Sequence, residues 1–519
     1  MKILFFYPPI TIFDPDPTIP GAVPPLGLAY LAAHLESAHH EVKIIDALSL
    51  GIDNIKKIEG GTRYGLDEKI ILDNIRAFQP DIVGISCMFS SYVTDAHRVA
   101  AIVKSYDCKI KVIFGGAHSS IKPEWVLSDN NVDIVVFGEG EITLLEIVTK
   151  IQNGVDFTNV PGIAFKENAK IIKNEPRQFI KDLDSLKFPA RHLLPMDIYL
   201  RHSKSPYNIR FPSTTIITSR GCPGNCVFCS IHSIWSHKWR CRSAKNVVDE
   251  IEHLVNEYGV REIEFLDDNI SVSKVRMESI CDEIIKRKID IKWATPNGIA
   301  YWTLDEELLR KMKKSGCYRL TFGIESGNIE TRKFIGKIQS LEKAKQIIQY
   351  ANKIGLWTIC TFIIGFPCEQ EDSIMDTIKY AVESGTDYAV FFLLGVFPGT
   401  RVYEIFKKEG LFNYDDVFEN LENATIDDFS ILGQTLASRG TQTIYFTQKE
   451  LQAYLDEAYK FFARNRIINY LNPVRILRKI KSLEDLLYTI KLGRAMTAPL
   501  YKMAFKKFKT HFVLRNKNM

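Results

Sequence analysis

The sequence predicts an α/β fold class: an N-terminal doubly wound, flavodoxin-like parallel sheet, then a partial (β/α)6 TIM-like barrel, then a mainly helical C-terminal region. Two observations predict it. Short apolar runs alternate with amphipathic helical patterns over residues 1–145, and a second alternation of the same kind begins at residue 213. Apolar strands separated by helices are typical of parallel sheets that are buried on both faces. A chain of 519 residues is long enough for two or three such domains.

The first alternation contains five apolar runs rich in β-branched or aromatic residues. The candidate strands are KILFFY (2–7), EVKIID (41–46), DIVGIS (81–86), KVIFGG (111–116) and DIVVFG (133–138). A doubly wound sheet binds ligands at the carboxyl ends of its strands. The loops expected there, YPPI, SCMFSS, GGAHSS and GEGE, are rich in small residues. Small residues would let a large flat ligand approach the backbone closely.

Residues 146–212 are interpreted as a connector, because they show little periodicity and contain several prolines. The second alternation, residues 213–405, has six strand candidates separated by amphipathic helices. They are STTIITS (213–219), EIEFLDD (262–268), IKWATPNG (291–298), YRLTFGIES (318–326), LWTICTFIIGFP (356–367) and DYAVFFLLGVFPG (387–399). Six strand–helix units predict a partial barrel, whose chemistry belongs on the loops that follow the strands. Residues 406–519 are expected to form the helical C-terminal region and to close one side of the barrel.

Composition favours a soluble globular protein of a reducing compartment. The content of hydrophobic residues (46%) and charged residues (25%) is ordinary for that class. No N-terminal segment has the layout of a signal peptide, and no apolar run reaches about 18 residues. We therefore expect a cytoplasmic protein, in which a tight cysteine cluster holds metal rather than forming disulfides. Isolated cysteines at or near strand positions, Cys317, Cys360 and Cys368, are expected to be small core residues.

The C-terminal tail is strongly basic. From Pro473 onward, twelve Lys and Arg residues are opposed only by Glu484 and Asp485, and phenylalanines lie between the basic residues. Such a tail suits peripheral contact with an anionic membrane surface. A solvated basic helix that covers the body of the protein is the alternative.

One loop carries three cysteines. The stretch SRGCPGNCVFCS places Cys222, Cys226 and Cys229 directly after the first barrel strand. A structural zinc site needs four ligands, and His232 or Cys241 could be the fourth, but a zinc ribbon has two separated pairs rather than one triplet. Soft thiolates also suit an iron–sulfur cluster. Three ligands would leave one iron open for a substrate or cofactor.

The motif Cys222-x3-Cys226-x2-Cys229, with Phe228 just before the last cysteine, resembles the signature of the radical S-adenosylmethionine (SAM) enzymes. The resemblance implies a 4Fe-4S cluster that is held by the three thiolates. It also implies that SAM binds the open iron and is split on reduction into methionine and a 5′-deoxyadenosyl radical. The implied SAM contacts lie mostly at the ends of barrel strands and are Phe228, Asp267, Asp268, Glu325 and Gly365.

Some of these contacts have structural alternatives. Where family members carry a Gly-Gly-Glu-like stretch, this sequence has FLDDN, so Asp267 and Asp268 either meet the SAM amino group or support the fold. Glu325, in GIES, matches the acidic residue expected near the SAM ribose and methionine portion. Its alternative is a cap of the following helix. Gly365, in FIIGFPCE, would allow the adenine to approach closely.

A doubly wound domain in front of such a barrel resembles the cobalamin-binding group of radical SAM enzymes. Three stretches carry this resemblance: VPPLGLAYLAAHLESAHHEVKIIDA, GGAHSSIKPEWVL and VVFGEGEITLLEI. It covers residues 1–145 and 213–405, and it implies that three loops of the first domain hold cobalamin. The implied contacts are Ser86, Ser90, Ser91, Gly115, Gly116, His118, Gly138 and Gly140.

No histidine is expected on cobalt. Methionine synthase-like proteins supply it from a D-x-H-x-x-G loop after the first strand, where this sequence has YPPITIF. His97, in DAHRVAA, follows an aspartate but lacks the glycine and falls on a helix. His118 lies in the fourth loop, where it would face a ligand or contact solvent or phosphate. A domain that keeps the fold without the cofactor is the alternative.

Two cofactors together imply methylation of an unactivated sp3 carbon. The adenosyl radical abstracts a hydrogen atom, and methylcobalamin delivers a methyl group to the substrate radical. The alternative reaction is oxidative cyclisation or rearrangement, as in the anaerobic magnesium-protoporphyrin cyclase, which this organisation also resembles. The alternative from another class is a non-catalytic cobalamin and iron–sulfur sensor. No residue is assigned a catalytic role, because the region from residue 406 has no motif that identifies the substrate.

The expected partners follow from this chemistry. They are a small-molecule or lipid-like substrate and an electron donor such as flavodoxin or ferredoxin. A nucleic-acid partner is not expected.

Overall fold

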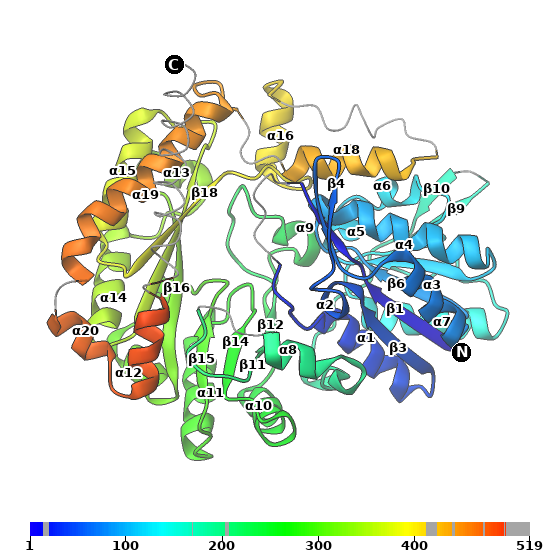
Figure 1. Cartoon of the computed structure of the whole chain (residues 1–519), viewed down its shortest axis with the longest axis horizontal. Helices are drawn as coiled ribbons and strands as arrows, with labels where there is room; N and C mark the ends of the chain where they lie inside the picture. Colours follow the sequence, from blue (N-terminus) through cyan, green and yellow to red (C-terminus); the bar gives the residue numbers. More distant parts are fainter. Residues whose placement is uncertain are drawn as a thin grey trace, which may run out of the picture.

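The structure is a computed structural model that describes residues 1–13, 20–168, 170–202, 207–411, 423–437, 442–470, 473–492 and 494. Two α/β units lie side by side, one built on residues of the N-terminal part and one on the middle of the chain (Figure 1). Helices of the C-terminal region lie against both units.

The first unit is a seven-stranded sheet in the order β10-β9-β8-β7-β6-β1-β3. Its parallel part consists of the five predicted strands: β1 (Lys2–Tyr7), β3 (Glu41–Asp46), β6 (Ile82–Ser86), β7 (Lys111–Gly115) and β8 (Ile134–Val136). Counted along the chain, these strands have the order 2-1-3-4-5, which is the doubly wound order of flavodoxin-like folds. The fold class predicted for this region is confirmed.

Helices cover both faces of this sheet. Ile3 and Phe5 of β1 are buried against α1 (Leu26–Ser37) and α7 (Gly140–Gln152), whereas Leu4 and Phe6 are buried on the opposite face. That second face carries α3 (Glu68–Phe78), α4 (Val93–Tyr106) and α6 (Pro123–Leu127). Successive strand residues point to opposite faces, so a strand covered on both faces must be apolar throughout. The short helices α2 (Ala47–Leu50) and α5 (Ala117–Ile121) follow β3 and β7.

Two parts of the first unit were not predicted. The hairpin β9 (Ile163–Glu167) and β10 (Lys170–Lys173) extends the sheet antiparallel to β8, from within the segment interpreted as a connector. A separate antiparallel sheet joins β2 (Ile10–Ile12), β5 (Gly61–Tyr64) and β4 (Ile55–Ile58). All five strands are short, and β4 is exposed along its whole length, so neither an apolar run nor a clear alternation marks them.

The second unit is an open, parallel, six-stranded barrel whose strands follow one another in chain order. They are β11 (Ser213–Ile216), β14 (Glu262–Phe265), β15 (Lys292–Thr295), β16 (Cys317–Glu325), β17 (Trp357–Ile364) and β18 (Tyr388–Leu393). All six predicted strands are present. A two-stranded ribbon, β12 (Ser219–Arg220) with β13 (Arg240–Cys241), flanks the cysteine loop.

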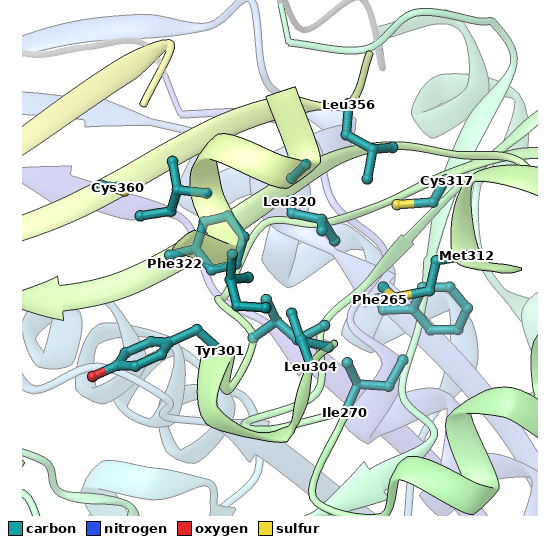
Figure 2. Close-up of a cluster of buried hydrophobic side chains, with 14 of the residues drawn as sticks. Phe265, Ile270, Tyr301, Leu304, Met312, Cys317, Leu320, Phe322, Leu356 and Cys360 are labelled. Carbon is teal, nitrogen blue, oxygen red and sulfur yellow. The ribbon is translucent and has the colours of Figure 1, made fainter. Parts of the chain in front are cut away.

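Amphipathic helices cover the outside of the barrel. They are α10 (Ala244–Tyr258), α11 (Lys274–Lys286), α12 (Glu306–Lys314), α14 (Leu341–Lys353) and α15 (Glu371–Glu383). Figure 2 shows part of the core between strands and helices, with Phe265, Leu320 and Phe322 among its members. Cys317 and Cys360 belong to this core, as expected, but Cys368 is exposed and the expectation for it was wrong.

An open barrel leaves β18 as an edge strand with unpaired backbone groups, which would be free to pair with another chain. Helix α19 (Gln448–Tyr470) covers this edge. The Tyr459 hydroxyl accepts a hydrogen bond from Phe391 N (3.1 Å) and donates one to Phe391 O (3.0 Å). The C-terminal region therefore closes one side of the barrel, as the sequence predicts.

Helix α18 (Ile426–Ala437) returns to the first unit rather than to the barrel, and packs against α4. The ring of Phe429 stacks on the ring of His97 at 3.5 Å between ring centroids. Thr94 Oγ1 donates to Phe429 O (3.0 Å). The C-terminal region thus contacts both units.

The described part of the basic tail packs on the barrel. Lys479, in α20 (Pro473–Lys479), is buried with Nζ 2.5 Å from Asp387 Oδ2, and Arg475 binds the same carboxylate (2.9 Å). Further along the tail, the Tyr488 ring packs edge-on against Trp357 at 5.7 Å.

Residues 473–492 therefore cover the body of the protein, which was the alternative interpretation, and peripheral contact with a membrane stays a prediction. Six of the twelve basic residues, Lys502, Lys506, Lys507, Lys509, Arg515 and Lys517, lie outside the described residues. Among the described helices, none is long and apolar enough to cross a membrane.

We expect the contact between Lys479 and Asp387 to hold the C-terminal region in place. Lys479→Met should lower the free energy of unfolding by about 3 kcal/mol, because it leaves a buried carboxylate short of one partner. Arg475 stays in contact with Asp387, so we expect the lower end of the range for such losses. Lys479 Nζ lies 4.4 Å from the Trp357 ring centroid, so urea unfolding followed by tryptophan fluorescence is a suitable measurement.

Lys481→Met is the matched control, because Lys481 belongs to the same segment and is exposed. We expect it to change stability by no more than about 0.5 kcal/mol. Equal unfolding midpoints for the two variants would show that the buried ion pair does not hold the C-terminal region.

Candidate active site

The segments that follow the strands of the two units contact each other (Figure 1). Helix α5, which follows β7, packs against α9 (Ile231–Trp235), which follows the cysteine loop. Arg220, two residues before the first cysteine, binds Glu139, which follows β8 (2.6 Å). The loops predicted to hold the two cofactors are therefore neighbours.

The cysteine loop connects β11 to α9 and is held by hydrogen bonds to three other segments. Gly221 N donates to Asp268 Oδ2 (2.9 Å), and Val227 N donates to Ile335 O (3.0 Å). Val402 N donates to Val227 O (3.0 Å). Gly221 has φ +88°, and a side chain there would collide with a backbone carbonyl, so only glycine fits the entry to the loop.

Cys222, Cys226 and Cys229 are half-buried on this loop. Burial raises the pKa of Cys226 and raises the pKa of Cys229 to about 12, and neighbouring thiols of the loop add to both shifts. Three thiolates would need a cation to balance them, which a metal cluster supplies. In the part of the chain that is described, no three His, Cys, Asp or Glu side chains are arranged so that they could hold a metal ion. The three thiols are of the type that binds an iron–sulfur cluster, but in this structure they are not arranged around a common metal position.

The two residues considered as a fourth zinc ligand make other contacts. The His232 ring stacks on the ring of His237 at 4.2 Å, and Cys241 lies in β13, paired with Ser219. The ring of Phe228 packs against the ring of Phe366, with 5.9 Å between the ring centroids. The aromatic residue of the motif therefore joins the cysteine loop to the loop after β17.

The two aspartates after β14 have different surroundings. Asp267 is buried, and it accepts hydrogen bonds from Thr218 Oγ1 (2.7 Å) and Ser219 Oγ (2.5 Å). It therefore supports the start of the cysteine loop, which was the alternative interpretation. Asp268 is exposed, yet partial desolvation by the surrounding protein raises its pKa to about 6. The negative charge of Asp267 adds to this shift.

Glu325 ends β16 in a left-handed conformation (φ +68°), buried beside Lys337, whose Nζ lies 2.9 Å away. A side chain at Gly323 would lie 2.6 Å from Glu325 Oε1, so the pair occupies the space above that glycine. Burial alone would lower the pKa of Lys337, but the charges of Glu325 and Cys226 outweigh it and raise the pKa. The helix-cap alternative for Glu325 was wrong, because Asn328 caps α13 (Ile329–Ile335).

The loop after β17 is held by a carboxylate that the sequence analysis did not single out. Glu369 Oε2 accepts hydrogen bonds from Gly365 N (2.7 Å) and Phe366 N (3.0 Å). Gly365 has φ +102°, which favours glycine. Burial raises the pKa of Glu369 to about 7. Lys337 was missed as well, since its position beside Glu325 depends on the path of the chain between them and not on a local motif.

The predicted cobalamin contacts lie on the segments that follow β6, β7 and β8. Cys87 N donates to Gly115 O (2.7 Å) and His118 N donates to Cys87 O (3.2 Å), so the first two segments are tied together. Ser90 Oγ lies 2.7 Å from His118 Nδ1. A side chain at Gly116 would lie 2.6 Å from the carbonyl oxygen of Cys87.

A cleft opens at the ends of β1 and β6. Its lining includes the apolar side chains of Met88 and Phe89, which are 44% and 56% exposed. The lining residues come from the two loops YPPI and SCMFSS and are Tyr7, Pro8, Pro9, Ile10, Ser86, Cys87, Met88, Phe89 and Tyr92. Exposed apolar side chains of this kind often mark a surface that binds a ligand or partner.

Neither histidine of this region is an exposed loop residue. His97 is buried in α4 with Nδ1 2.7 Å from Asp129 Oδ2. His118 is buried in the short helix α5, where desolvation lowers its pKa to about 3 and keeps the ring neutral. The expectation that His118 would contact solvent was therefore wrong, whereas its contact with phosphate stays a prediction.

Comparison with known proteins identifies both units. Residues 17–148 match the B12 binding domain, and residues 216–381 match the radical SAM superfamily. The chain is 37% identical over 407 residues to an uncharacterized methyltransferase, PH0819, of Pyrococcus horikoshii, an alignment that covers 78% of this chain and 83% of that protein.

Two further relatives carry names of different reactions. The cytidylyl-2-hydroxyethylphosphonate methyltransferase of Streptomyces wedmorensis is 32% identical over 474 residues, covering 82% of this chain and 88% of the relative. The anaerobic magnesium-protoporphyrin IX monomethyl ester cyclase of Rubrivivax gelatinosus is 28% identical over 422 residues, covering 80% of this chain and 72% of the relative.

A solved structure shares the whole arrangement. It is the radical SAM methyltransferase TsrM of Kitasatospora setae with cobalamin and a 4Fe-4S cluster bound, which superposes with a TM-score of 0.66 at 16% identity, covering 89% of this chain and 88% of that one. The likeness confirms the fold of both units and of their combination. The chain belongs to the cobalamin-binding radical SAM enzymes.

Proposed function

We propose that this protein transfers a methyl group to an unactivated carbon of a small molecule, with cobalamin, SAM and a 4Fe-4S cluster as cofactors. The observation that carries the proposal is the contact between the cysteine loop and the loops after β7 and β8, which gives the two cofactor sites one common boundary. Two relatives that are named as methyltransferases align with this chain over more than four fifths of their own length, which supports the reaction type.

Cys222, Cys226 and Cys229 would hold the cluster, and Phe228, which precedes the last cysteine, packs against Phe366. The 4Fe-4S cluster, SAM and cobalamin, when bound, supply radical hydrogen abstraction and a transferable methyl group. The protein's part is to bind and orient them, and to keep water from the reactive species.

The residues around the cysteine loop would bind SAM. Asp268 is exposed, and its one hydrogen-bond donor among the described residues is Gly221 N, so it is available for a cationic group. Glu325 and Lys337 form a buried pair beside Cys226, which suits a ligand that carries both signs of charge. Gly365 is proposed as the contact of the adenine ring, and a Leu451 methyl group lies 3.3 Å from the position that a Cβ would take there. Asp267 serves the loop and not the ligand, because Thr218 and Ser219 already bind it.

The first unit would bind cobalamin over the cleft at the ends of β1 and β6. The contacts proposed there are Ser86, Ser90, Ser91, Gly115, Gly116, His118, Gly138 and Gly140. Neither His97 nor His118 is exposed, so no histidine is proposed as a cobalt ligand. A cytoplasmic flavodoxin or ferredoxin would supply the electron.

Cyclisation is a second candidate reaction, because a relative named as a magnesium-protoporphyrin cyclase aligns over 80% of this chain. Methyl transfer is favoured because the more similar relatives carry methyltransferase names. The sensor alternative is tested by turnover.

Replacing all three cysteines Cys222, Cys226 and Cys229 with Ala should abolish cluster binding. The wild-type chain, reconstituted anaerobically, should bind about four irons and absorb visible light. The variant should bind none, because no other cysteine triplet replaces the loop. Iron analysis together with the absorption spectrum is the measurement.

Cys368→Ala is the control, since Cys368 is exposed and not a proposed ligand. It should retain the wild-type iron content. A triple variant that keeps its iron would show that the ligands lie elsewhere, and a colourless zinc-bound wild-type chain would restore the zinc-site interpretation.

Cobalamin should bind without a histidine on cobalt. The electron paramagnetic resonance (EPR) spectrum of bound cob(II)alamin should lack nitrogen splitting from an axial imidazole, and His118→Ala should leave it unchanged. Free imidazole, added in excess, provides the positive control for the splitting. Axial nitrogen splitting in the wild-type spectrum that disappears in His118→Ala would assign His118 to cobalt.

An enzyme and a sensor differ in turnover. With SAM and a strong reductant, the loaded chain should release 5′-deoxyadenosine, and the triple cysteine variant should release none. Cells that express the chain and are supplied with methyl-deuterated methionine should contain a small molecule with a deuterated methyl group that is absent with the variant. A new product without the label would favour cyclisation, and no 5′-deoxyadenosine would favour a sensor.

A further inference from the structure

We propose that Glu139, Glu141, Arg220 and Arg240 are positioning residues that fix the cobalamin loop relative to the cysteine loop. The inference rests on the proposed function, because it concerns the distance between the two cofactors. It assigns a role to four charged residues that neither cofactor needs as ligands.

Glu139 occupies the N-cap position of α7, but its side chain makes no cap hydrogen bond. Its Oε1 binds Arg220 Nη1 (2.6 Å) and Arg240 Nη1 (2.8 Å), and its Oε2 accepts from Ile180 N (2.6 Å). Glu141, in the first turn of the same helix, binds Arg220 Nη2 (2.5 Å). A carboxylate at a helix N-terminus normally accepts hydrogen bonds from the backbone N–H groups of its own helix. These two carboxylates bind arginines of the other unit instead.

The two arginines are opposite each other in the ribbon of β12 and β13, where Arg220 pairs with Arg240. Like charges that are directly opposite each other on neighbouring strands repel. The ribbon therefore needs the two glutamates to balance its positive charge. Glu139 contacts both guanidinium groups, and Glu141 contacts that of Arg220. The ribbon that leads into the cysteine loop is thus electrostatically incomplete without the first unit.

The four side chains are shielded from water, with exposed fractions between 4% and 12%. The Trp235 ring lies beside both guanidinium groups, 5.8 Å from each. Tyr30 flanks Arg220 (5.7 Å), and Phe179 flanks Arg240 (4.6 Å). Charge pairs in such surroundings are screened little by salt, and Arg220 binds the two glutamates through separate nitrogens, so the contacts define a distance and not only an attraction.

Each end of this network adjoins a proposed cofactor contact. Glu139 lies between Gly138 and Gly140, two of the proposed cobalamin contacts, and Gly138 N donates to Ser120 Oγ (3.1 Å). Arg220 is two residues before Cys222. A shift of either loop must therefore move the other, or break the ion pairs.

The test uses the full chain loaded with a 4Fe-4S cluster and cobalamin. Glu139→Gln with Glu141→Gln keeps the shape of both side chains and removes their charges. The reduced cluster and cob(II)alamin are both paramagnetic, and their spin–spin interaction depends on the distance between them. We expect pulsed EPR to show a single narrow distance distribution in the wild type and a broadened or shifted one in the variant.

The formation of methylcobalamin from SAM and reduced cobalamin gives a second readout. We expect it to slow by about 10- to 100-fold in the variant, as for a displacement of about 1 Å between reacting groups. Iron content, cobalamin binding and the release of 5′-deoxyadenosine without cobalamin should stay near wild type, because each of them needs only one unit.

Glu146→Gln is the matched control, because Glu146 lies in the same helix and pairs with Arg177 rather than with the ribbon. It should give the wild-type distance distribution. If the double variant fails to bind either cofactor, Glu141→Gln alone, which breaks one pair with Arg220, is measured in its place. A wild-type distance distribution in a loaded variant would overturn the positioning role, whereas a wild-type chain that binds no cobalamin would overturn the proposed function itself.

Discussion

The cysteine loop depends on contacts from outside itself, and this constraint organises the rest of the structure. The loop has no strand or helix between β12 and α9, so its own backbone cannot fix its shape. Asp267 and Asp268 hold its start, Ile335 and Val402 hold its middle, and Phe366 packs against Phe228 near its end. These residues follow β14, β16, β18 and β17, so the form of the loop depends on the assembled barrel.

The open barrel explains why the C-terminal region is needed. A six-stranded open barrel has an exposed edge at β18 and an uncovered end at the start of its strands, and both must be covered. Tyr459 satisfies backbone groups of the edge, and Asp387 at the start of β18 binds Lys479 and Arg475. Lys479 is therefore used inside the protein, with Arg475 on the same carboxylate, whereas Arg478 and Lys481 are exposed. Helix α18 meanwhile packs on α4, so one region of the chain joins both units.

Most of the fold could be predicted because its strands are buried on both faces. Such strands must be apolar throughout, and helices must separate them, so the pattern is visible in the sequence itself. The hairpin of β9 and β10 and the small sheet around β5 could not be predicted, because short, half-polar strands give no such pattern. The packing of the tail could not be predicted for a related reason: a run of Lys and Arg shows the charge, but the buried carboxylate that binds Lys479 lies 92 residues earlier in the chain.

The candidate site divides in the same way. The three cysteines could be proposed from the sequence because the motif is local, and so could Glu325 at the end of its strand. Lys337 and Glu369 were not, since each acts on a partner that only the folded chain brings near. The partners of the ion pairs from Glu139 and Glu141 to Arg220 are 81 and 79 residues apart, and nothing in the stretches GEGE and SRGC indicates that their charges meet.

The charged residues near the site can be separated by whether their charge is already satisfied. Asp267 is bound by two hydroxyl groups, and Glu139 is bound by two guanidinium groups and a backbone N–H. Burying a charge is costly unless it is paired, so these groups hold segments in place. Asp268 is different: it is exposed, and the one donor it has among the described residues is a backbone N–H. This remaining capacity for hydrogen bonds is why Asp268, like the pair of Glu325 and Lys337, is proposed as a SAM contact.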